Sequence, residues 1–317
     1  MRTMTIGPND AGQRLDRFLG KALPALPAGL CSKFIRTKYI KLNGARTEGN
    51  VRLAEGDVLT FYIHDKFFLT SESDDAYQAA GKPVNILYED ENILLAVKEP
   101  GLSVHEDESG DPDTLINRIK YHCKAEGSWD PASEHAFAPA LCNRIDRNTG
   151  GIVIAAKNAE ALREMNELIR ARSIDKYYLS IVHGELPPAG RLRGYLKKIE
   201  SENRVIVRDE PFPEARTAIT EYRTLAVRDG LSLCECHLIT GRTHQIRAQM
   251  AHAGHPLLGD GKYGKGGDAR RYQALFSYKL VFSFKEDIGI LNALRGKIFT
   301  VSDVDFVREY FPEYRIL

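Results

Sequence analysis

The chain has 317 residues, of which 43% are hydrophobic, and its formal net charge is +1. This length exceeds the usual size of one compact core and indicates two domains. The longest apolar runs are too short to span a membrane, and the first ten residues lack the apolar core of a signal peptide. We therefore expect a soluble, cytoplasmic protein without a membrane partner. Five scattered cysteines favour reduced thiols over a disulfide framework.

Positive charge is concentrated at the N-terminus. Residues 1–63 contain 10 Lys/Arg and 5 Asp/Glu, whereas the remainder contains 34 and 38. Small basic domains often bind phosphate backbones. The stretch that precedes Pro83 is polar and acidic in its middle, which is typical of a linker. The sequence therefore predicts an N-terminal domain over 1–65, a linker over 66–82 and a larger domain over 83–317.

The basic segment is predicted to contain two helices and a β hairpin. The first helix lies within 14–23, with apolar residues at helical spacing and basic residues elsewhere on the cylinder. The second starts with Ser32 as its cap and carries basic residues as far as Lys38. Asn43-Gly44 then predicts a hairpin turn, and a short β unit follows it.

This order of elements resembles the S-four-type RNA-binding domain, a small α/β unit found in ribosomal proteins and in several RNA-modifying enzymes. The resemblance implies that residues 1–65 bind RNA. A generic small basic domain is the alternative, because the insertion between Pro24 and Pro27 departs from the pattern. The basic residues that we expect to contact RNA are Arg14, Arg17, Lys33 and Arg36.

From Pro83 onward, strands follow one another without regular helical crossovers. The predicted elements are a hairpin at 84–101, a strand at 151–157, a helix at 158–172 opened by Asn158, a strand at 175–184, a strand pair at 215–240 with an Asp-Gly turn, and a helix at 240–254 ended by Gly254. This succession implies an α+β domain built on a mixed, largely antiparallel sheet. Residues 299–317 predict a capped amphipathic helix and suggest no function.

Nucleotide-driven chemistry and metal binding receive little support. The segment YGKGGDAR lacks the spacing of a P-loop, and no G-x-G-x-x-G follows a predicted strand. Zinc is the less favoured interpretation of CECH, since Cys234 and Cys236 lie two apart on a strand and no C-x-x-C pair exists. We expect these cysteines to be buried structural residues, and we expect neither a metal nor an organic cofactor.

The stretch NRIDRNTGG, residues 143–151, places Asp146 between Arg144 and Arg147, directly before an apolar strand. A carboxylate that stays ionised in a partly buried position needs a neighbouring cation, because desolvation alone favours its protonated form. Taken alone, the stretch favours a solvated charged face.

Two further stretches change that interpretation. They are KYYLSIVHG, residues 176–184, and LITGRTHQIRAQMAHAGHPLLGDGKYG, residues 238–264. Together with the first stretch they resemble the RluA-type pseudouridine synthases. The hallmarks of that family are His-Arg-Leu-Asp-x-x-Thr-Ser-Gly, Lys-x-Tyr, and Thr-Gly-Arg-Thr-His-Gln-Ile-Arg followed by Gly-His-Pro and Gly-Asp. The resemblance extends from about Pro83 to Phe284 and implies the pseudouridine synthase fold.

The first motif departs from the family pattern at three positions. Asn143, Ile145 and Gly150 stand where the family has His, Leu and Ser, whereas Asp146 and Thr149 match. We interpret the changes as adjustments of loop packing or substrate fit. An inactive relative is the alternative, although the other two motifs are intact.

The resemblance implies that the chain converts uridine in RNA to pseudouridine. This reaction breaks the bond between uracil N1 and ribose, turns the base and rejoins it through C5. By resemblance, Asp146 is the nucleophilic or charge-stabilising carboxylate, and Arg247 is its cation, with a guanidinium suited to a bidentate pair. Tyr178 aligns with the Tyr of Lys-x-Tyr and offers a surface for uracil, while Tyr177 points to the opposite face of its strand.

Further motif residues are expected to contact the substrate. Arg144 either fills the space left by an extruded base or binds a phosphate. The expected substrate-binding residues of the larger domain are Arg144, Thr149, Lys176, Arg242, His244 and Gln245.

We expect RNA to be the partner of a monomeric enzyme. Ribosomal RNA is the favoured substrate because of the basic N-terminal segment, and transfer RNA is the alternative. A second hypothesis is a noncatalytic RNA-binding or ribosome-assembly factor that has kept the fold.

Overall fold

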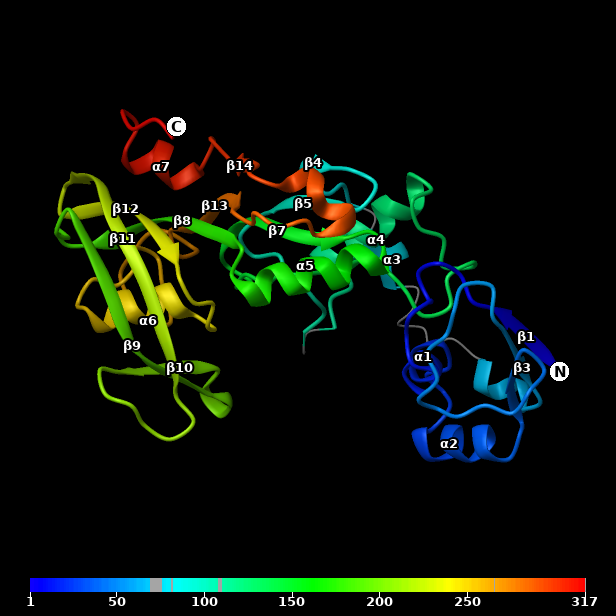
Figure 1. The fold of residues 1–317 in the computed structure, drawn as a ribbon. Helices are drawn as coiled ribbons and strands as arrows, with labels where there is room; N and C mark the ends of the chain where they lie inside the picture. Colours follow the sequence, from blue (N-terminus) through cyan, green and yellow to red (C-terminus); the bar gives the residue numbers. More distant parts are fainter. Residues whose placement is uncertain (69–75, 81, 108–109, 265, 317) are drawn as a thin grey trace.

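The computed structural model describes residues 1–68, 76–80, 82–107, 110–264 and 266–316. Among these residues the strands form two separate sheets, one of three strands and one of eleven (Figure 1). No helix within the described ranges is long and apolar enough to cross a membrane.

The three-stranded sheet belongs to the N-terminal unit, which we define as residues 1–68. Its strands are β1 (Arg2–Thr5), β3 (Val58–Phe61) and β2 (Ile40–Leu42), in that order and antiparallel. Helices α1 (Leu15–Ala22) and α2 (Ala28–Arg36) pack on it, and a short 3-10 helix, η1 (Asp65–Phe68), follows. Leu15, Phe18, Leu19, Ile35, Leu59 and Phe61 share its core.

The hairpin prediction for this unit is confirmed. Asn43 and Gly44 have φ values of 49° and 75°, and Ala45 N donates to Leu42 O at 2.9 Å. Both central residues of such a turn need positive φ, which Asn and Gly accept most readily.

Two details of the predicted second helix are wrong. Helix α2 starts at Ala28 after Pro27, so Ser32 lies inside it and caps nothing. The fixed φ of proline, here −58°, explains why the start lies further upstream. Lys38 lies beyond the C-cap Thr37 and has a φ of 67°, outside the helix.

Strand β1 was not predicted, since its mostly exposed residues show no apolar alternation.

The large sheet has the order β10-β9-β11-β12-β8-β13-β7-β5-β4, with β14 beside β13 and β6 beside β7. Its strands are β4 (Ile86–Glu89), β5 (Ile93–Lys98), β6 (Ala140–Leu141), β7 (Gly150–Ala156), β8 (Ile174–His183), β9 (Ala189–Ile199), β10 (Arg204–Arg208), β11 (Arg216–Arg228), β12 (Leu231–Leu238), β13 (Leu275–Phe282) and β14 (Ile298–Thr300). Only the contact of β13 with β7 is parallel among the described pairs, so the predicted mixed, largely antiparallel sheet is confirmed.

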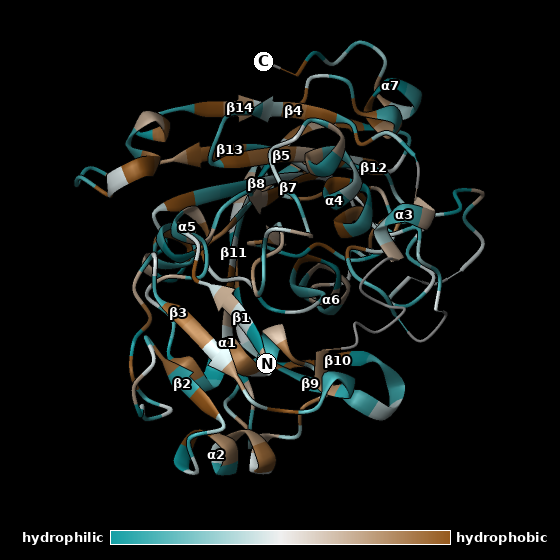
Figure 2. Cartoon of the chain, turned by 90° about the vertical axis from the view of Figure 1, so that its right-hand side faces the viewer, coloured by the Kyte–Doolittle hydropathy of each residue, from teal (hydrophilic) through white to brown (hydrophobic). Residues whose placement is uncertain are grey.

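Helices cover both faces of this sheet. They are α3 (Ala76–Ala80), α4 (Leu115–Ala125), α5 (Ala159–Ala171), α6 (Gln245–His252) and α7 (Asp305–Tyr310), with 3-10 helices η3 (Glu200–Glu202) and η4 (Gly289–Leu294). Helices α4 and α6 share a core with Leu94 and Val153, whereas α5 packs on Leu95 and Ile154 of the other face. Strand β7 is buried throughout because both of its faces are covered. Figure 2 shows the hydrophobic residues running along β5 and β13.

Most strands and helices predicted beyond Pro83 are present. Asn158 caps α5 by accepting a hydrogen bond from Ala161 N at 2.8 Å, as predicted. The predicted cap of the C-terminal helix is wrong, since Val304 precedes α7 and offers no side-chain cap. This helix is instead fixed by packing, with Phe306 in a core shared with Leu179 of β8.

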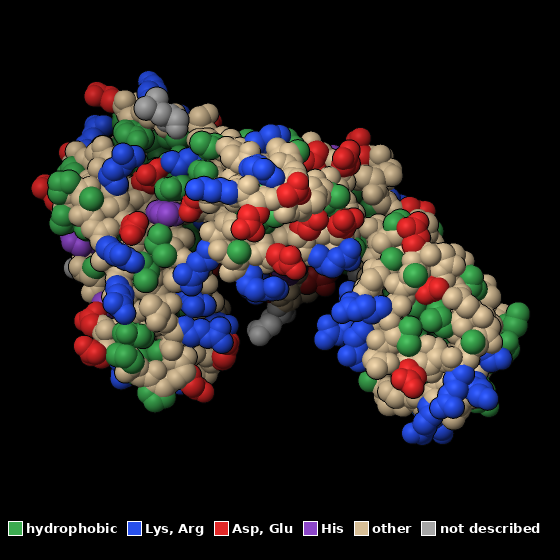
Figure 3. Space-filling model, viewed as in Figure 1, with side chains coloured by type: hydrophobic (Ala, Val, Ile, Leu, Met, Phe, Trp, Pro, Cys, Tyr) green, Lys and Arg blue, Asp and Glu red, His purple; other side chains and the backbone are tan. Residues whose placement is uncertain are grey.

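Among the described residues, hydrogen bonds connect the N-terminal unit to residues 134–136 and Ala159. Asp10 accepts hydrogen bonds from His135 N and Ala136 N at 3.3 and 3.2 Å, and Asn9 Oδ1 accepts from Ala159 N at 3.1 Å. Figure 3 shows a hollow between this unit and the lobe that carries β9 and β10. Of the predicted linker, residues 69–75 and 81 lie outside the described residues.

Candidate active site

Asp146 lies in the loop that precedes β7, at the edge of the buried core. Its side chain is 25% exposed, and its Oδ2 accepts a hydrogen bond from Arg247 Nη1 at 2.8 Å. Thr149 N donates to Asp146 O at 3.0 Å and tightens the loop. The predicted pairing of Asp146 with Arg247 is therefore present, across 101 positions of sequence.

Arg247 is held mainly by a different acid, Asp260. The Nε and Nη2 atoms of Arg247 donate to the two carboxylate oxygens of Asp260 at 2.7 and 2.9 Å. The bidentate partner of Arg247 is thus Asp260, whereas Asp146, which was expected in that role, accepts a single hydrogen bond. Among the described residues, Arg247 is the only side chain that donates a hydrogen bond to Asp146.

The charges of Asp146, Arg247 and Asp260, which we call the triad, stabilise one another. Burial raises the pKa of Asp260, but the hydrogen bonds and charge of Arg247 outweigh it and bring the pKa below its ordinary value. Burial lowers the pKa of Arg247, but the hydrogen bonds and charges of Asp260, and then those of Asp146, outweigh this effect. The pKa of Arg247 is therefore above its ordinary value. Asp260 is fully buried and is also bonded by Lys262 N and Tyr263 N. Asp260 therefore fixes the guanidinium so that one N–H points at Asp146.

Tyr178 lies on β8, near enough to Asp146 to be affected by its charge. It is 6% exposed and shares the core of Ile145, Ile246 and Met250. Burial, reinforced by the negative charge of Asp146, raises the pKa of Tyr178 to about 12, so the phenol stays protonated. Tyr177 lies on the opposite face, stacked on His237 with ring centroids 4.5 Å apart, as strand alternation predicts.

His244 lies close to the same carboxylate. Its Nε2 is 3.8 Å from Asp146 Oδ2, and its Nδ1 lies 2.9 Å from the hydroxyl of Tyr263. Burial lowers the pKa of His244 to about 4, so the imidazole is neutral at pH 7. Because the Tyr263 hydroxyl accepts from Val205 N, its proton is free to reach Nδ1. That arrangement places the imidazole proton on Nε2, the nitrogen that faces Asp146.

Two residues expected to contact RNA are instead buried. Thr149 is 2% exposed and accepts a hydrogen bond from Gln273 Nε2 at 3.1 Å. Gln245 Oε1 accepts from Arg242 N at 3.1 Å, and its Nε2 donates to Ile219 O at 3.0 Å. Both side chains hold loops of the site in place.

The other residues that were expected to contact RNA lie on separate elements of the structure. Lys176 lies on the Tyr178 face of β8, where burial lowers its pKa. Arg144 is exposed beside the Asp146 loop, and its charge adds to the burial that lowers the pKa of His105. Arg242 precedes α6 and donates from Nε to Thr217 O at 3.2 Å. The exposed residues Arg14, Arg17, Lys33 and Arg36 lie on or beside α1 and α2 of the N-terminal unit.

Two of the three departures from the family motif, Asn143 and Gly150, have local structural explanations. Asn143 Oδ1 accepts from Ile154 N at 2.7 Å and ties the loop to β7. A Cβ at Gly150 would approach the Phe276 ring to 2.7 Å, so glycine leaves room for that ring. Gly151, which matches the family motif, has a φ of 117°, and a Cβ there would lie 2.3 Å from Ser277 O.

Lys98 was not predicted as part of the site. It is 1% exposed, and its Nζ donates to Glu99 O, Leu102 O and Arg147 O at 2.8 to 2.9 Å. Burial lowers the pKa of Lys98 to about 7, against the attraction of Asp146. Its position at the end of an apolar strand was the available signal, since a lysine there needs buried acceptors.

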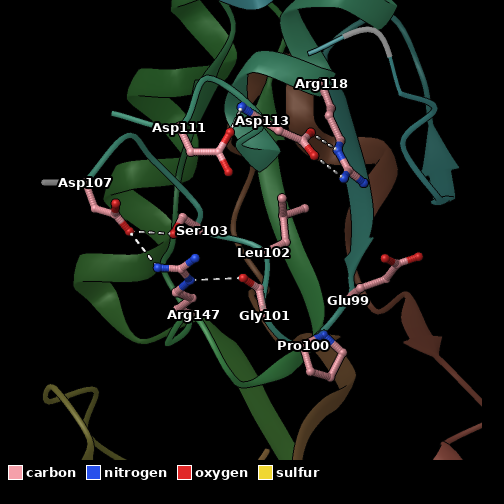
Figure 4. A pocket seen from close by; sticks show the side chains of 10 residues that line it. All are labelled: Glu99, Pro100, Gly101, Leu102, Ser103, Asp107, Asp111, Asp113, Arg118 and Arg147. Carbon is pink, nitrogen blue, oxygen red and sulfur yellow. Dashed lines mark hydrogen bonds and ion pairs between the residues drawn. The ribbon is translucent and has the colours of Figure 1, made fainter. Parts of the chain in front are cut away.

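A cavity of about 200 Å³ lies behind the Asp146 loop (Figure 4). Arg147 enters it and donates from Nε to Gly101 O at 3.1 Å, and Arg118 is paired with Asp113 at 2.7 Å. Asp146 does not line this cavity. No three His, Cys, Asp or Glu side chains in the described part of the chain gather in a way that suits a metal ion.

The sequence and the fold are both similar to those of one family of RNA-modifying enzymes. Residues 92–252 match the family model for RNA pseudouridylate synthase. The chain is 33% identical to an uncharacterized RNA pseudouridine synthase of Mycoplasma genitalium over 85% of each chain. It is 29% identical to ribosomal large subunit pseudouridine synthase D of Xylella fastidiosa over 93% of this chain and 86% of that one.

A solved structure of similar fold supports the architecture. Human RNA pseudouridylate synthase domain containing 4 superposes with a TM-score of 0.54 at 20% identity, covering 74% of this chain and 94% of that one. The chain therefore belongs to the RNA pseudouridylate synthase family and is an enzyme that isomerises uridine in RNA to pseudouridine. The matched family region starts at residue 92 and does not include the N-terminal unit.

Proposed function

We propose that this enzyme modifies uridines of large-subunit ribosomal RNA and that Asp146 is its nucleophile. The observation that carries the proposal is the array of Asp146, Arg247 and Asp260, in which Asp146 Oδ2 accepts one oriented N–H from Arg247 at 2.8 Å. A carboxylate held through one oxygen in this way leaves its second oxygen for the substrate.

The reaction balances without any other reactant. An Asp146 oxygen bonds to C1′ of ribose as the bond from C1′ to uracil N1 breaks, and the electron pair stays on uracil. The base then turns, C5 bonds to C1′, and the aspartate leaves. The proton of C5 is lost, and N1 gains one.

Tyr178 and Arg247 have distinct roles in this proposal. Tyr178 supplies a ring against which the turned base packs, and its protonated hydroxyl lies near the negative charge of Asp146. Arg247 orients the Asp146 carboxylate through its hydrogen bond. Arg144 and Lys176 contact the RNA beside the reacting nucleotide, and His244 presents a neutral N–H toward the carboxylate.

Two observations favour ribosomal RNA over transfer RNA. The first is the excess of five positive charges in residues 1–63, which suits a large structured RNA. The second is that relatives of Xylella fastidiosa, Nitrosomonas europaea and Xanthomonas campestris are named ribosomal large subunit pseudouridine synthase D. We further propose that residues 1–65 form an RNA-binding domain of the S-four type, joined by a linker at 66–82 to a catalytic domain at 83–317. The enzyme acts as a monomer in the cytoplasm.

The test is tritium release from RNA labelled at C5 of uridine. The wild-type protein should release tritium from large-subunit ribosomal RNA, and Asp146→Asn should release none while still binding it. Asp229→Asn, which removes an exposed carboxylate from a turn, is the matched control and should stay active. Activity in Asp146→Asn would refute the nucleophile, and release confined to transfer RNA would refute the substrate. Mapping pseudouridines in RNA from cells with and without the gene identifies the positions.

A further inference from the structure

Tyr263 connects an edge strand of the large sheet to the candidate active site. Helix α6 packs against β9 and β10 (Figure 1), and Tyr263 lies in the loop beyond it that contains Asp260. The Tyr263 hydroxyl accepts a hydrogen bond from Val205 N of β10 at 2.8 Å and lies 2.9 Å from His244 Nδ1. The centroid of its ring is 5.3 Å from Arg247 Cζ. Tyr263 therefore contacts β10 and two residues of the site at once.

The hydrogen bonds of Tyr263 fix which nitrogen of His244 carries the proton. A phenol hydroxyl donates one proton, and Val205 N already occupies one of its acceptor positions. Among the described residues, His244 Nδ1 is the only acceptor within hydrogen-bonding distance of that hydroxyl. Because Nδ1 accepts, a neutral imidazole carries its proton on Nε2.

The position of His244 favours the neutral imidazole. Its side chain is 9% exposed, and burial lowers the pKa of His244 to about 4, against the attraction of Asp146. The charge of Arg247 lowers this pKa further. His244 is also the N-cap of α6, where the positive end of the helix dipole disfavours an additional cation. His244 is thus a neutral N–H donor at pH 7.

The Nε2–H of His244 has no hydrogen-bond acceptor in the described part of the chain. It faces Asp146 Oδ2 at 3.8 Å, which is beyond hydrogen-bonding distance, and that oxygen already accepts from Arg247 Nη1 at 2.8 Å. A nucleotide that bonds to Asp146 therefore lies close to this N–H. In the proposed reaction the electron pair of the broken bond stays on uracil, and a donor oriented in advance stabilises such a developing charge.

We propose that His244 donates its Nε2–H to the uracil anion that forms when the bond from C1′ to N1 breaks, and that Tyr263 is a positioning residue that fixes the tautomer of His244. The proton stays on Nε2 in this step, so no other reactant is needed. The proposal rests on the proposed function in taking Asp146 as the nucleophile. It adds Tyr263, for which the sequence predicted no role, and it makes His244 a determinant of rate rather than of RNA affinity.

The test is a double-variant cycle of Tyr263→Phe and His244→Ala in the full chain. Tyr263→Phe removes the hydroxyl and keeps the ring that packs against the cluster containing Val205. Tyr88→Phe is the matched control, since the hydroxyl of Tyr88 on β4 donates to Asp90 at 2.8 Å, outside the site.

The probe is total RNA from cells that lack the gene, labelled with tritium at C5 of uridine, so that it contains ribosomal and transfer RNA alike. Single-turnover tritium release is measured with enzyme in excess. Both the maximal rate and the enzyme concentration that gives half of it are determined.

We expect the maximal rate to fall by about 10²-fold in His244→Ala and by about tenfold in Tyr263→Phe, with the half-maximal concentration unchanged. In the His244→Ala background, Tyr263→Phe should cause no further loss, because its effect acts through His244. An equal loss in both backgrounds would show a purely structural role of Tyr263 and would overturn the proposal. So would a wild-type rate in Tyr263→Phe.

The tautomer of His244 is measured separately by ¹⁵N NMR of histidine-labelled protein, in which His244→Ala identifies the signals. Wild type should show a protonated Nε2 and an unprotonated Nδ1 at pH 7, whereas Tyr263→Phe should show a mixture of both tautomers. A wild-type His244 protonated on Nδ1 would refute the proposal. Tritium release by Asp146→Asn would refute the nucleophile alone, because the cycle and the NMR spectra decide the roles of Tyr263 and His244 independently.

Discussion

The candidate active site and the N-terminal unit use charge in opposite ways. In the site, Asp146, Arg247 and Asp260 are joined by hydrogen bonds of 2.7 to 2.9 Å, and Asp260 is fully buried. In the N-terminal unit, Arg17, Lys33 and Arg36 are exposed, and their side chains have no hydrogen-bond or ion-pair partner among the described residues.

This difference predicts that the first region determines the rate of the reaction and that the second determines the affinity for RNA. Buried, bonded charges are oriented before the substrate arrives and are hardly screened by salt, so they suit transition-state stabilisation. Exposed, unpaired cations make few internal contacts and are strongly screened, so they suit the attraction of a phosphate backbone. Variants in the two regions should therefore change different measured quantities.

Arg247→Met should have the largest effect. It leaves Asp260 buried without its cation, which should lower the free energy of unfolding by about 3 to 5 kcal/mol. It also removes the oriented donor of Asp146, so the single-turnover rate should fall by about 10²- to 10³-fold. Denaturant unfolding and tritium release measure the two effects.

A double variant separates stability from chemistry. Arg247→Met with Asp260→Leu removes both buried charges, so it should recover much of the lost stability but none of the lost rate. If the double variant regained the wild-type rate, the triad would be structural and the proposed role of Arg247 would be wrong.

The combined variant Arg17→Gln, Lys33→Gln and Arg36→Gln should have the next largest effect, on RNA binding alone. The salt slope of log Kd should fall by about 0.7 to 0.9 for each ion pair with a phosphate that is removed, while the rate at saturating RNA stays unchanged. Glutamine replacements of Arg163, Arg228 and Arg295, which lie outside the N-terminal unit, serve as the control. A lower saturated rate would show that the N-terminal unit helps to build the catalytic site.

The sequence predicts local and motif-bearing features of this protein well. Asn43-Gly44, the Asn158 cap and the alternation of Tyr177 and Tyr178 depend on neighbouring residues, and the structure has all three. The pairing of Asp146 with Arg247 followed from family resemblance, which substitutes for long-range information.

Other features depend on contacts that no local pattern encodes. The sequence contains the Gly-Asp of residue 260 but gives no sign that this aspartate takes the bidentate position on Arg247. Lys98 is recognisable only once three carbonyls from two loops surround it. The family motifs suggested substrate contacts for Thr149 and Gln245, whereas tertiary hydrogen bonds bury both side chains.

Lys98 tests whether a buried lysine near Asp146, without an acidic hydrogen-bond partner, makes the stability of the fold depend on pH. Its pKa is lowered to about 7 by burial, so the unfolded chain binds more protons than the folded one between about pH 7 and 10.5. The stability that this lowering contributes is present above pH 10.5 and is lost as pH falls through about 7. In denaturant unfolding, wild type should therefore gain stability from pH 7 to 9 relative to Lys98→Met. Parallel curves for the two proteins would show that Lys98 does not titrate in this range.

Asp10 extends the comparison of the two regions, because it is a buried charge within the N-terminal unit. It is 1% exposed at the junction with residues 135–136, and burial raises its pKa despite the hydrogen bonds from His135 N and Ala136 N and the charges of His135 and Lys21. Since the folded pKa is raised, this contribution to stability is present below pH 3.8 and is lost as pH rises through the folded value. Asp10→Asn keeps an acceptor for the junction and removes the titration.

The expected difference in the free energy of unfolding between wild type and Asp10→Asn is small, about 1 kcal/mol or less at pH 7. This difference should shrink as pH falls toward 4. Asp57→Asn is the control, since that carboxylate lies within the N-terminal unit and bonds Ala54 N and Asn43 rather than the junction. Thermal unfolding of both variants from pH 4 to 7 measures the difference. An identical pH dependence in wild type and Asp10→Asn would mean that the junction tolerates the charge.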